Sequence, residues 1–151
     1  MSSREQELVS IAHRVLPGGS LGNIGNDLVI DRGKGSHIWD VGGNEYIDYL
    51  LGSGPMLVGH SHPEVLEVVR EQIEKGTTFF LANESAILLA EEIVRAVPCA
   101  EKVRFSSTGS EATLYAMRAA RAYRGRDKIL KFEGGFHGMN DYALMSMAPA
   151  N

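Results

Sequence analysis

The stretch Val103-Arg104-Phe105-Ser106-Ser107-Thr108-Gly109-Ser110-Glu111 decides the predicted fold, because it runs from a β-rich tripeptide through a polar turn into a helix. Small and apolar residues continue at helical spacing from Ala112 to Tyr123, and Gly125 supplies an end to that helix. A second β-rich segment follows at Ile129-Leu130-Lys131-Phe132. Strand, helix and strand within about 30 residues predict a βαβ unit with parallel strands, and therefore an α/β fold.

The amino-terminal part has a different pattern. Apolar residues keep helical spacing over 8–16 until the break Pro17-Gly18-Gly19, and the glycine-rich residues 18–26 read as a loop. An antiparallel meander is predicted from three short β-rich segments separated by glycine turns, at 28–30, 37–39 and 46–49.

Two more helices are expected before the βαβ unit. The first covers 63–75 and has Ser61 or His62 as its cap, while the second begins after Asn83 and is closed by Pro98. We therefore expect two parts: a helix and β-meander segment in residues 1–60, and the incomplete beginning of a large α/β domain in residues 61–151.

Composition narrows the class of protein. The 151 residues are 44% hydrophobic, and 15 basic against 19 acidic residues give a net charge of −4, which predicts no binding to nucleic acid or to an anionic membrane. Cys99 is the one cysteine, so neither an internal disulfide nor a thiolate metal cluster is possible. With no long apolar run in the sequence, a cytoplasmic location is expected.

Two loops are candidates for chemistry. Thr108, Gly109 and Ser110 open a helix at the carboxyl end of a predicted strand, where free backbone N–H groups favour an anion, and a phosphate fits several converging donors better than a carboxylate does. The alternative is a capping box, since Thr108 and Glu111 have the spacing with which a helix satisfies its own end.

The second loop, Gly134-Gly135-Phe136-His137-Gly138, should emerge at the same edge of the sheet. Phe136 could stack on a flat ring and His137 could donate a hydrogen bond or move a proton, although a turn with an aromatic plug and a satisfied histidine explains the same residues. His60 and His62 could pair on a metal, but no acidic or cysteine cluster accompanies them, which favours helix capping.

Several blocks, taken together and in order, resemble the class III aminotransferases that depend on pyridoxal 5'-phosphate (PLP), and most closely their glutamate-1-semialdehyde 2,1-aminomutase branch. The resemblance covers essentially the whole chain. It is carried by these blocks: Leu16-Pro17-Gly18-Gly19, Asp40-x-x-Gly43-Asn44-Glu45-Tyr46-Ile47-Asp48, Gly54-Pro55-Met56, Gly59-His60-Ser61-His62-Pro63, Ser107-Thr108-Gly109-Ser110-Glu111-Ala112 and Phe132-Glu133-Gly134-Gly135-Phe136-His137-Gly138.

The resemblance implies a fold type I enzyme that moves an amino group through a Schiff base of PLP, with its active site near the interface of a homodimer. It implies that Gly109 and Ser110, beside Thr108, hold the cofactor phosphate. It implies further that Phe136 stacks on the pyridine ring with His137 beside it, and that Ser53 and Gly54 lie close to a small-molecule amino donor or acceptor. No metal is implied.

The sequence departs from the family pattern in two places. None of its lysines stands in the context of the Schiff-base lysine, which we expect downstream, so that this amino-terminal portion alone would be inactive. Residues 20–25 also lack the arginine with which the aminomutases tend to bind a substrate carboxylate. The competing hypothesis is a catalytically incompetent fragment or degenerate paralogue that acts as a binding or dimerisation module.

Overall fold

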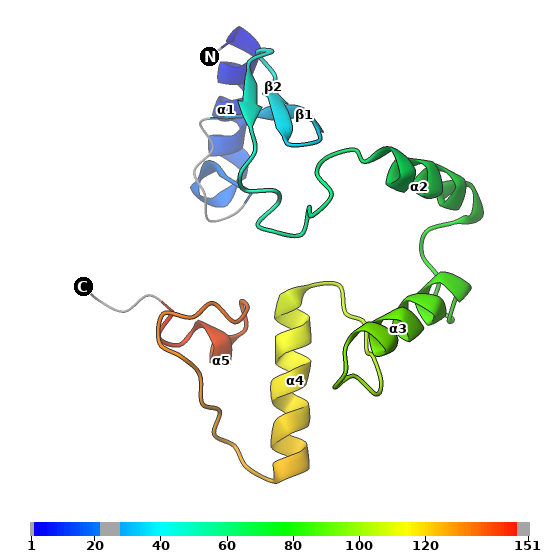
Figure 1. The fold of residues 1–151 in the computed structure, drawn as a ribbon. Helices are drawn as coiled ribbons and strands as arrows, with labels where there is room; N and C mark the ends of the chain where they lie inside the picture. Colours follow the sequence, from blue (N-terminus) through cyan, green and yellow to red (C-terminus); the bar gives the residue numbers. More distant parts are fainter. Residues whose placement is uncertain (1, 22–27, 148–151) are drawn as a thin grey trace. The chain divides into compact units, whose positions relative to one another are not determined.

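The computed structural model describes residues 2–21 and 28–147, and the chain divides into two compact units, Met1–Phe79 and Phe80–Asn151. The first unit contains helix α1 (Ser3–Val15), the short 3-10 turn η1 (Pro17–Gly19), strands β1 (Ile30–Lys34), β2 (His37–Asp40) and β3 (Glu45–Ile47), and helix α2 (Pro63–Lys75) (Figure 1). The second unit contains helices α3 (Glu84–Ala96), α4 (Gly109–Arg124) and α5 (Asp141–Leu144). The predicted domain division at residue 60 stays a prediction.

The predicted antiparallel meander is confirmed. The sheet has the order β1-β2-β3, in which Gly33 pairs with Ile38 and Trp39 with Glu45. The first and third strands are displaced from the predicted segments, since β1 reaches Lys34 and β3 ends at Ile47. Gly35, with φ +57°, makes the turn between β1 and β2, at one of the glycine turns that the sequence indicates.

The turn between β2 and β3 is built around Asp40, a buried carboxylate. Its Oδ1 accepts hydrogen bonds from the backbone N–H groups of Gly42 and Asn44, both at 2.8 Å. Its Oδ2 accepts from Asn44 Nδ2 at 2.8 Å and from the Tyr46 hydroxyl at 2.9 Å. These bonds, led by the one from the Asn44 side chain, lower the pKa of Asp40 and keep it ionised. Much of the Asp40–Asp48 motif therefore serves to close this turn.

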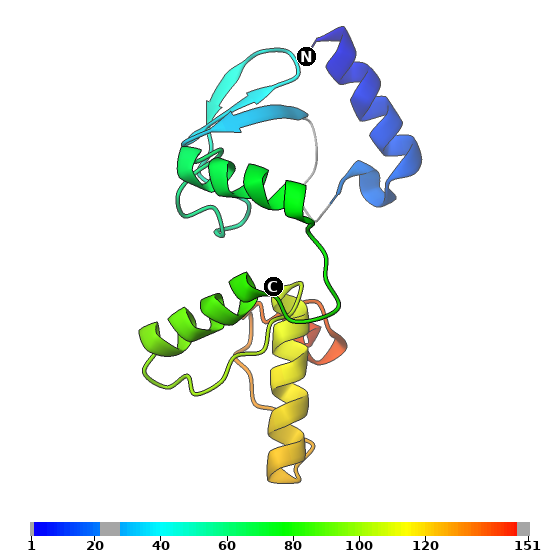
Figure 2. The same ribbon diagram turned by 90° about the vertical axis from the view of Figure 1, so that its right-hand side faces the viewer.

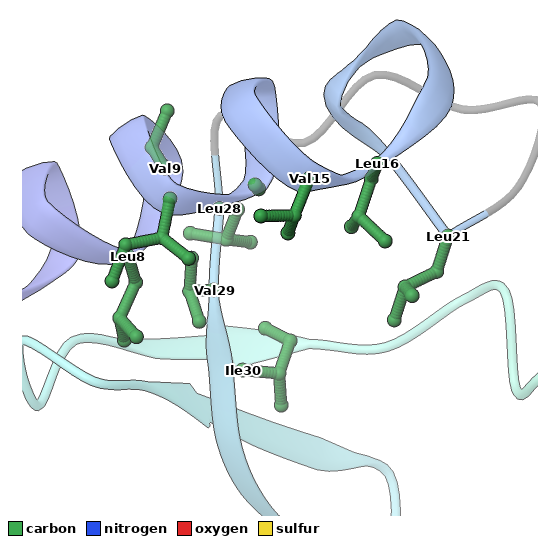
Figure 3. A pocket seen from close by; sticks show the side chains of 10 residues that line it. Leu8, Val9, Val15, Leu16, Leu21, Leu28, Val29 and Ile30 are labelled. Carbon is green, nitrogen blue, oxygen red and sulfur yellow. The ribbon is translucent and has the colours of Figure 1, made fainter.

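Helix α1 lies against the chain that leads into the sheet. Ser2 caps it by accepting from the backbone N–H of Glu5 at 3.2 Å, and the buried Glu5 carboxylate lies 3.5 Å from the backbone nitrogen of Val29. Between α1 and residues 28–30 is an apolar cavity of about 480 Å³ (Figure 3). Its lining is Leu8, Val9, Ile11, Ala12, Val15, Leu16, Leu21, Leu28, Val29 and Ile30. Aliphatic walls of this kind give no partner to a phosphate ester.

Helices α2, α3 and α4 begin and end where the sequence indicates. Helix α2 starts at Pro63 after His62, whose side chain makes no capping hydrogen bond, and Gly76 follows its last residue. Helix α3 is capped by Asn83, which accepts from the backbone N–H of Ala86 at 3.0 Å. Helix α4 ends at Gly125, which has φ +59°.

The two strands predicted around α4 are not formed in the described part of the chain. Residues 103–105 and 129–132 belong to no helix or strand. A strand exists only where a neighbouring strand exchanges backbone hydrogen bonds with it, and neither segment has such a neighbour among the described residues. The helix of the predicted βαβ unit is therefore confirmed, whereas the parallel pair is not.

After α4 the chain returns along that helix to its amino-terminal half (Figures 1 and 2). Asn140 caps α5, and the Lys131 ammonium donates to the backbone carbonyls of Ala143, at 2.8 Å, and Met145. Ala143 is the one buried apolar side chain among the described residues. No helix in residues 2–21 or 28–147 is long and apolar enough to cross a membrane.

Candidate functional site

The start of α4 satisfies part of its own backbone. Thr108 Oγ1 accepts from the backbone N–H of Glu111 at 3.1 Å, while Glu111 Oε2 accepts from the backbone N–H groups of Ser107 at 2.7 Å and Thr108 at 3.1 Å. The capping box suggested by the sequence is thus confirmed. It also engages Glu111, the one acidic residue in the first turn of the helix, in two hydrogen bonds.

Two backbone donors remain after this capping. The N–H groups of Gly109 and Ser110 make no hydrogen bond within the described part of the chain. A β-carbon built on Gly109 would meet no atom within 4 Å, so no other part of the described chain fills the space on the side-chain side of Gly109. The capping box and an anion site are therefore compatible, because the box occupies the donors on either side of this pair and leaves the pair itself free.

The second predicted loop meets the helix at Ser110. Ser110 Oγ accepts from the backbone N–H of Met139 at 2.9 Å. Gly138 is buried against the helix, where a β-carbon would lie 2.7 Å from Thr113 Oγ1 and 3.0 Å from Ser110 Cα. Since Ser110 only accepts in this bond, its hydroxyl hydrogen remains available to a ligand.

Phe136 and His137 stand just before this contact. The Phe136 ring is 64% exposed and is therefore free to cover a flat molecule. His137 is half-buried, and its Nε2 is shielded from solvent and has no hydrogen-bond partner among the described residues. Its ring turns back over Gly135, where a β-carbon would lie 2.6 Å from Nε2. The structure thus brings the helix start and the second loop together through Ser110, Gly138 and Met139.

Ser53 and Gly54 lie in the first unit, in the loop that joins β3 to α2. Both have positive φ, +66° for Ser53 and +106° for Gly54. The Gly54 N–H donates to the carbonyls of Leu50 and Leu51, both at 3.2 Å. Their role toward a substrate stays a prediction.

The histidine pair in front of α2 is divided between two roles. His60 Nε2 makes a 2.7 Å hydrogen bond to Asp48 Oδ2, whereas His62 occupies the cap position of α2. Among the described residues, no three His, Cys, Asp or Glu side chains are grouped so that they could hold a metal ion.

Sequence reasoning missed the close approach of Gly138 to Thr113 and the bond between Asp48 and His60. Both join residues that lie far apart in the sequence. The available signal was that Asp48, His60 and Gly138 each belong to one of the ordered motif blocks.

A comparison with known protein families covers the residues of both candidate loops. The family model described as aminotransferase class III matches residues 22–151. The chain belongs to the class III aminotransferase family. The resemblance that the ordered motif blocks indicate is therefore confirmed.

Among curated class III relatives, the chain is similar to a glutamate-1-semialdehyde 2,1-aminomutase from Methanothermobacter thermautotrophicus. The two are 47% identical over 146 residues, which is 94% of this chain and 35% of that protein. The chain thus spans about a third of the length of the curated relatives it matches.

Solved structures of class III relatives show the same fold. An ω-transaminase from Sphaerobacter thermophilus superposes with a TM-score of 0.91 at 37% identity, covering 97% of this chain and 34% of the other. A transaminase with PLP bound gives a TM-score of 0.92 at 33% identity, covering 97% of this chain and 35% of the other. The predicted fold type I architecture is confirmed, although its parallel strands are not paired within the described residues.

Proposed function

We propose that this chain supplies the phosphate-binding helix start and the ring-stacking loop of the PLP site in a class III aminotransferase or aminomutase. The observation that carries the proposal is the pair of unbonded N–H groups at Gly109 and Ser110, in open space beside the Ser110 hydroxyl. When bound, PLP supplies an electron sink that allows an amino group to move between molecules or within one.

The residues present fit a phosphate ester. The first two residues of α4 offer two backbone donors and the Ser110 hydroxyl at the positive end of the helix dipole, and Gly109 has no side chain to cover them. Thr108 accepts from Glu111 in the capping box, so its part is to hold the helix start and to offer its remaining hydroxyl hydrogen.

The loop residues fit the flat part of the cofactor. The exposed Phe136 ring can cover a heterocycle, and His137 follows it directly, with its Nε2 turned toward Gly135. The bond from Met139 to Ser110 holds this loop at the helix start, which would keep the ring and the phosphate donors in fixed register.

The proposal extends to the rest of the enzyme. It includes a homodimer in the cytoplasm, with Ser53 and Gly54 facing a small-molecule amino donor or acceptor. The similarity to glutamate-1-semialdehyde aminomutases favours a substrate of that kind. The lysine that binds PLP would lie outside these 151 residues, and the use of Lys131 to hold α5 through two carbonyls agrees with this.

The test compares PLP with pyridoxal, which lacks the phosphate, as ligands of the full-length protein measured by equilibrium dialysis. Ser110→Ala removes a hydrogen bond to a charged group, worth about 1.5–3 kcal/mol, and should weaken PLP binding roughly 10- to 100-fold. Gly109→Asp places a carboxylate at the donors and should weaken it further. Pyridoxal affinity should change little in either variant.

Ser85→Ala is the matched control, because Ser85 is the second residue of α3 as Ser110 is of α4. It should bind both ligands as the wild type does. If Gly109→Asp and Ser110→Ala keep the wild-type preference for PLP over pyridoxal, the start of α4 does not hold the phosphate and the proposal is wrong.

A further inference from the structure

The loop between β3 and α2, residues 49–59, is closed at both ends by one side-chain pair. Asp48 and His60 flank the loop, and the 2.7 Å hydrogen bond between Asp48 Oδ2 and His60 Nε2 joins its two ends. Two backbone hydrogen bonds between Gly35 and His60, both at 2.8 Å, fix the far end to the β1–β2 turn. Asp48 N donates to the Ser36 carbonyl at 2.8 Å and fixes the near end to the same turn. The ends of the loop are therefore anchored to the sheet.

The second oxygen of Asp48 shapes the start of the loop. Asp48 Oδ1 accepts from the backbone N–H groups of Leu50 at 2.9 Å and Leu51 at 3.0 Å. The next turn depends on this one, because the carbonyls of Leu50 and Leu51 accept from the N–H of Gly54. One carboxylate thus binds both the histidine at the end of the loop and the two amides at its beginning.

The loop holds a backbone conformation that needs such support. Leu51 has φ +47° and Ser53 has φ +66°, which are unfavourable for residues with a β-carbon. Strained residues of this kind persist only where the surrounding structure over-determines them, and they concentrate at functional sites.

The Asp48–His60 pair is well shielded and held in place. The side chains are 11% and 23% exposed, and the hydrogen bond from His60 is the main cause of the lowered pKa of Asp48. The His60 ring packs on Gly33, where a β-carbon would come within 2.6 Å of the ring. His37 offers a contrast: its Nδ1 lies 2.7 Å from Glu45 Oε1, but both side chains are about half exposed and belong to neighbouring strands.

We propose that the Asp48–His60 pair positions residues 49–59 and thereby sets the orientation of Ser53 and Gly54 toward the amino substrate. Asp48 and His60 act through the loop, and neither needs to touch the substrate. The proposal rests on the proposed function, because it takes Ser53 and Gly54 as the substrate-facing residues of that enzyme. It assigns to the pair an effect on substrate binding that is separate from cofactor binding.

The test uses His60→Leu, His60→Gln and the control His37→Leu in the full-length PLP-loaded protein. The glutamine amide can donate from about the place of the imidazole Nε2, whereas leucine cannot donate at all. With whichever of glutamate, alanine or 1-phenylethylamine the wild type uses best as amino donor, His60→Leu should raise KM at least tenfold and change kcat less than threefold. His60→Gln should restore KM to within about threefold, and His37→Leu should leave it unchanged.

Two further measurements make the outcome decisive. PLP affinity should be the same in all three variants, and hydrogen exchange at the Leu50, Leu51 and Gly54 amides should be at least tenfold faster in His60→Leu alone. An unchanged KM or unchanged hydrogen exchange in His60→Leu overturns the proposal. A loss of PLP affinity in His60→Leu as large as the rise in KM also overturns it, because it would indicate general unfolding. If the wild type uses none of the three donors, glutamate-1-semialdehyde takes their place as substrate. If that compound also gives no turnover, the proposed function fails, and the exchange rates alone decide whether the pair orders the loop.

Discussion

Replacing Gly138 with alanine should detach the second loop from α4. Gly138 has φ +106°, and a β-carbon there would lie 2.7 Å from Thr113 Oγ1 and 3.0 Å from Ser110 Cα. If the loop stayed in place, the added methyl group would strain a well-packed contact at a cost of about 1–3 kcal/mol. Moving the loop would break the 2.9 Å bond from Met139 to Ser110, which costs about 0.5–1.5 kcal/mol. The loop is therefore expected to move.

Gly134→Ala is the matched control for this change. Gly134 also has positive φ, +72°, but a β-carbon there would meet nothing within 4 Å. Both variants place a β-carbon at positive φ, at a cost of about 1–2 kcal/mol or more, so the difference between them reports the contact with the helix together with the less favourable φ of Gly138. We expect Gly138→Ala to be less stable than Gly134→Ala by about 1 kcal/mol in urea unfolding of the full-length protein.

Hydrogen exchange at the Met139 amide reports the same event locally. Gly138→Ala should exchange this amide at least tenfold faster than the wild type, whereas Gly134→Ala should leave it protected. Adding Thr113→Ala to Gly138→Ala removes the nearest atom and should restore part of the protection. Equal stability of the two glycine variants, together with a protected Met139 amide in both, would refute the argument that the loop is held by close approach to the helix.

Three other outcomes follow from the contacts described. Thr108→Ala removes the cap of α4 and should cost about 1 kcal/mol of stability in urea unfolding. Because hydrogen bonds lower the pKa of Asp40 below its ordinary 3.8, its stabilising effect is present above that value and is lost as the pH falls through the lowered pKa. Asp40→Asn should therefore flatten the acid limb of a stability–pH curve. Gly33→Ala should displace the His60 ring at a cost of about 1–3 kcal/mol, visible as a changed imidazole signal in the NMR spectrum.

Local signals explain why the helices could be predicted from the sequence. The capping residues of α3 and α4 each act within one turn of the helix end that they define. Their residue types are therefore enough to place the start of α3 at Asn83 and the two ends of α4 at Thr108, with Glu111, and at Gly125. The meander is predictable for a similar reason, because glycine turns join its strands directly. Strand β1 is displaced from the predicted segment because its pairing with β2 continues through Gly33 and Lys34 up to the turn at Gly35.

Contacts between distant residues explain why other features of the fold and of the candidate site could not be predicted from the sequence. The tripeptide 103–105 has strand-forming residues, but a strand also needs a partner, and no propensity supplies one. The bond from Met139 to Ser110 spans 29 residues and that between Asp48 and His60 spans 12, so neither leaves a periodic trace in the sequence. The candidate phosphate donors could be predicted because a helix start is a local feature of the sequence. The hydrogen bond that fixes the second loop to this helix start could not be predicted, because it joins distant residues.

The capping box affects how much conformational entropy a ligand would cost on binding at this helix end. Because Thr108 and Glu111 close the helix end with their own atoms, a phosphate bound as proposed at Gly109 and Ser110 would meet a helix start that is already ordered. Binding then carries little conformational entropy cost at this end of the helix. In the proposed site, such a ligand would therefore bind and leave without fraying or rebuilding of the first turn.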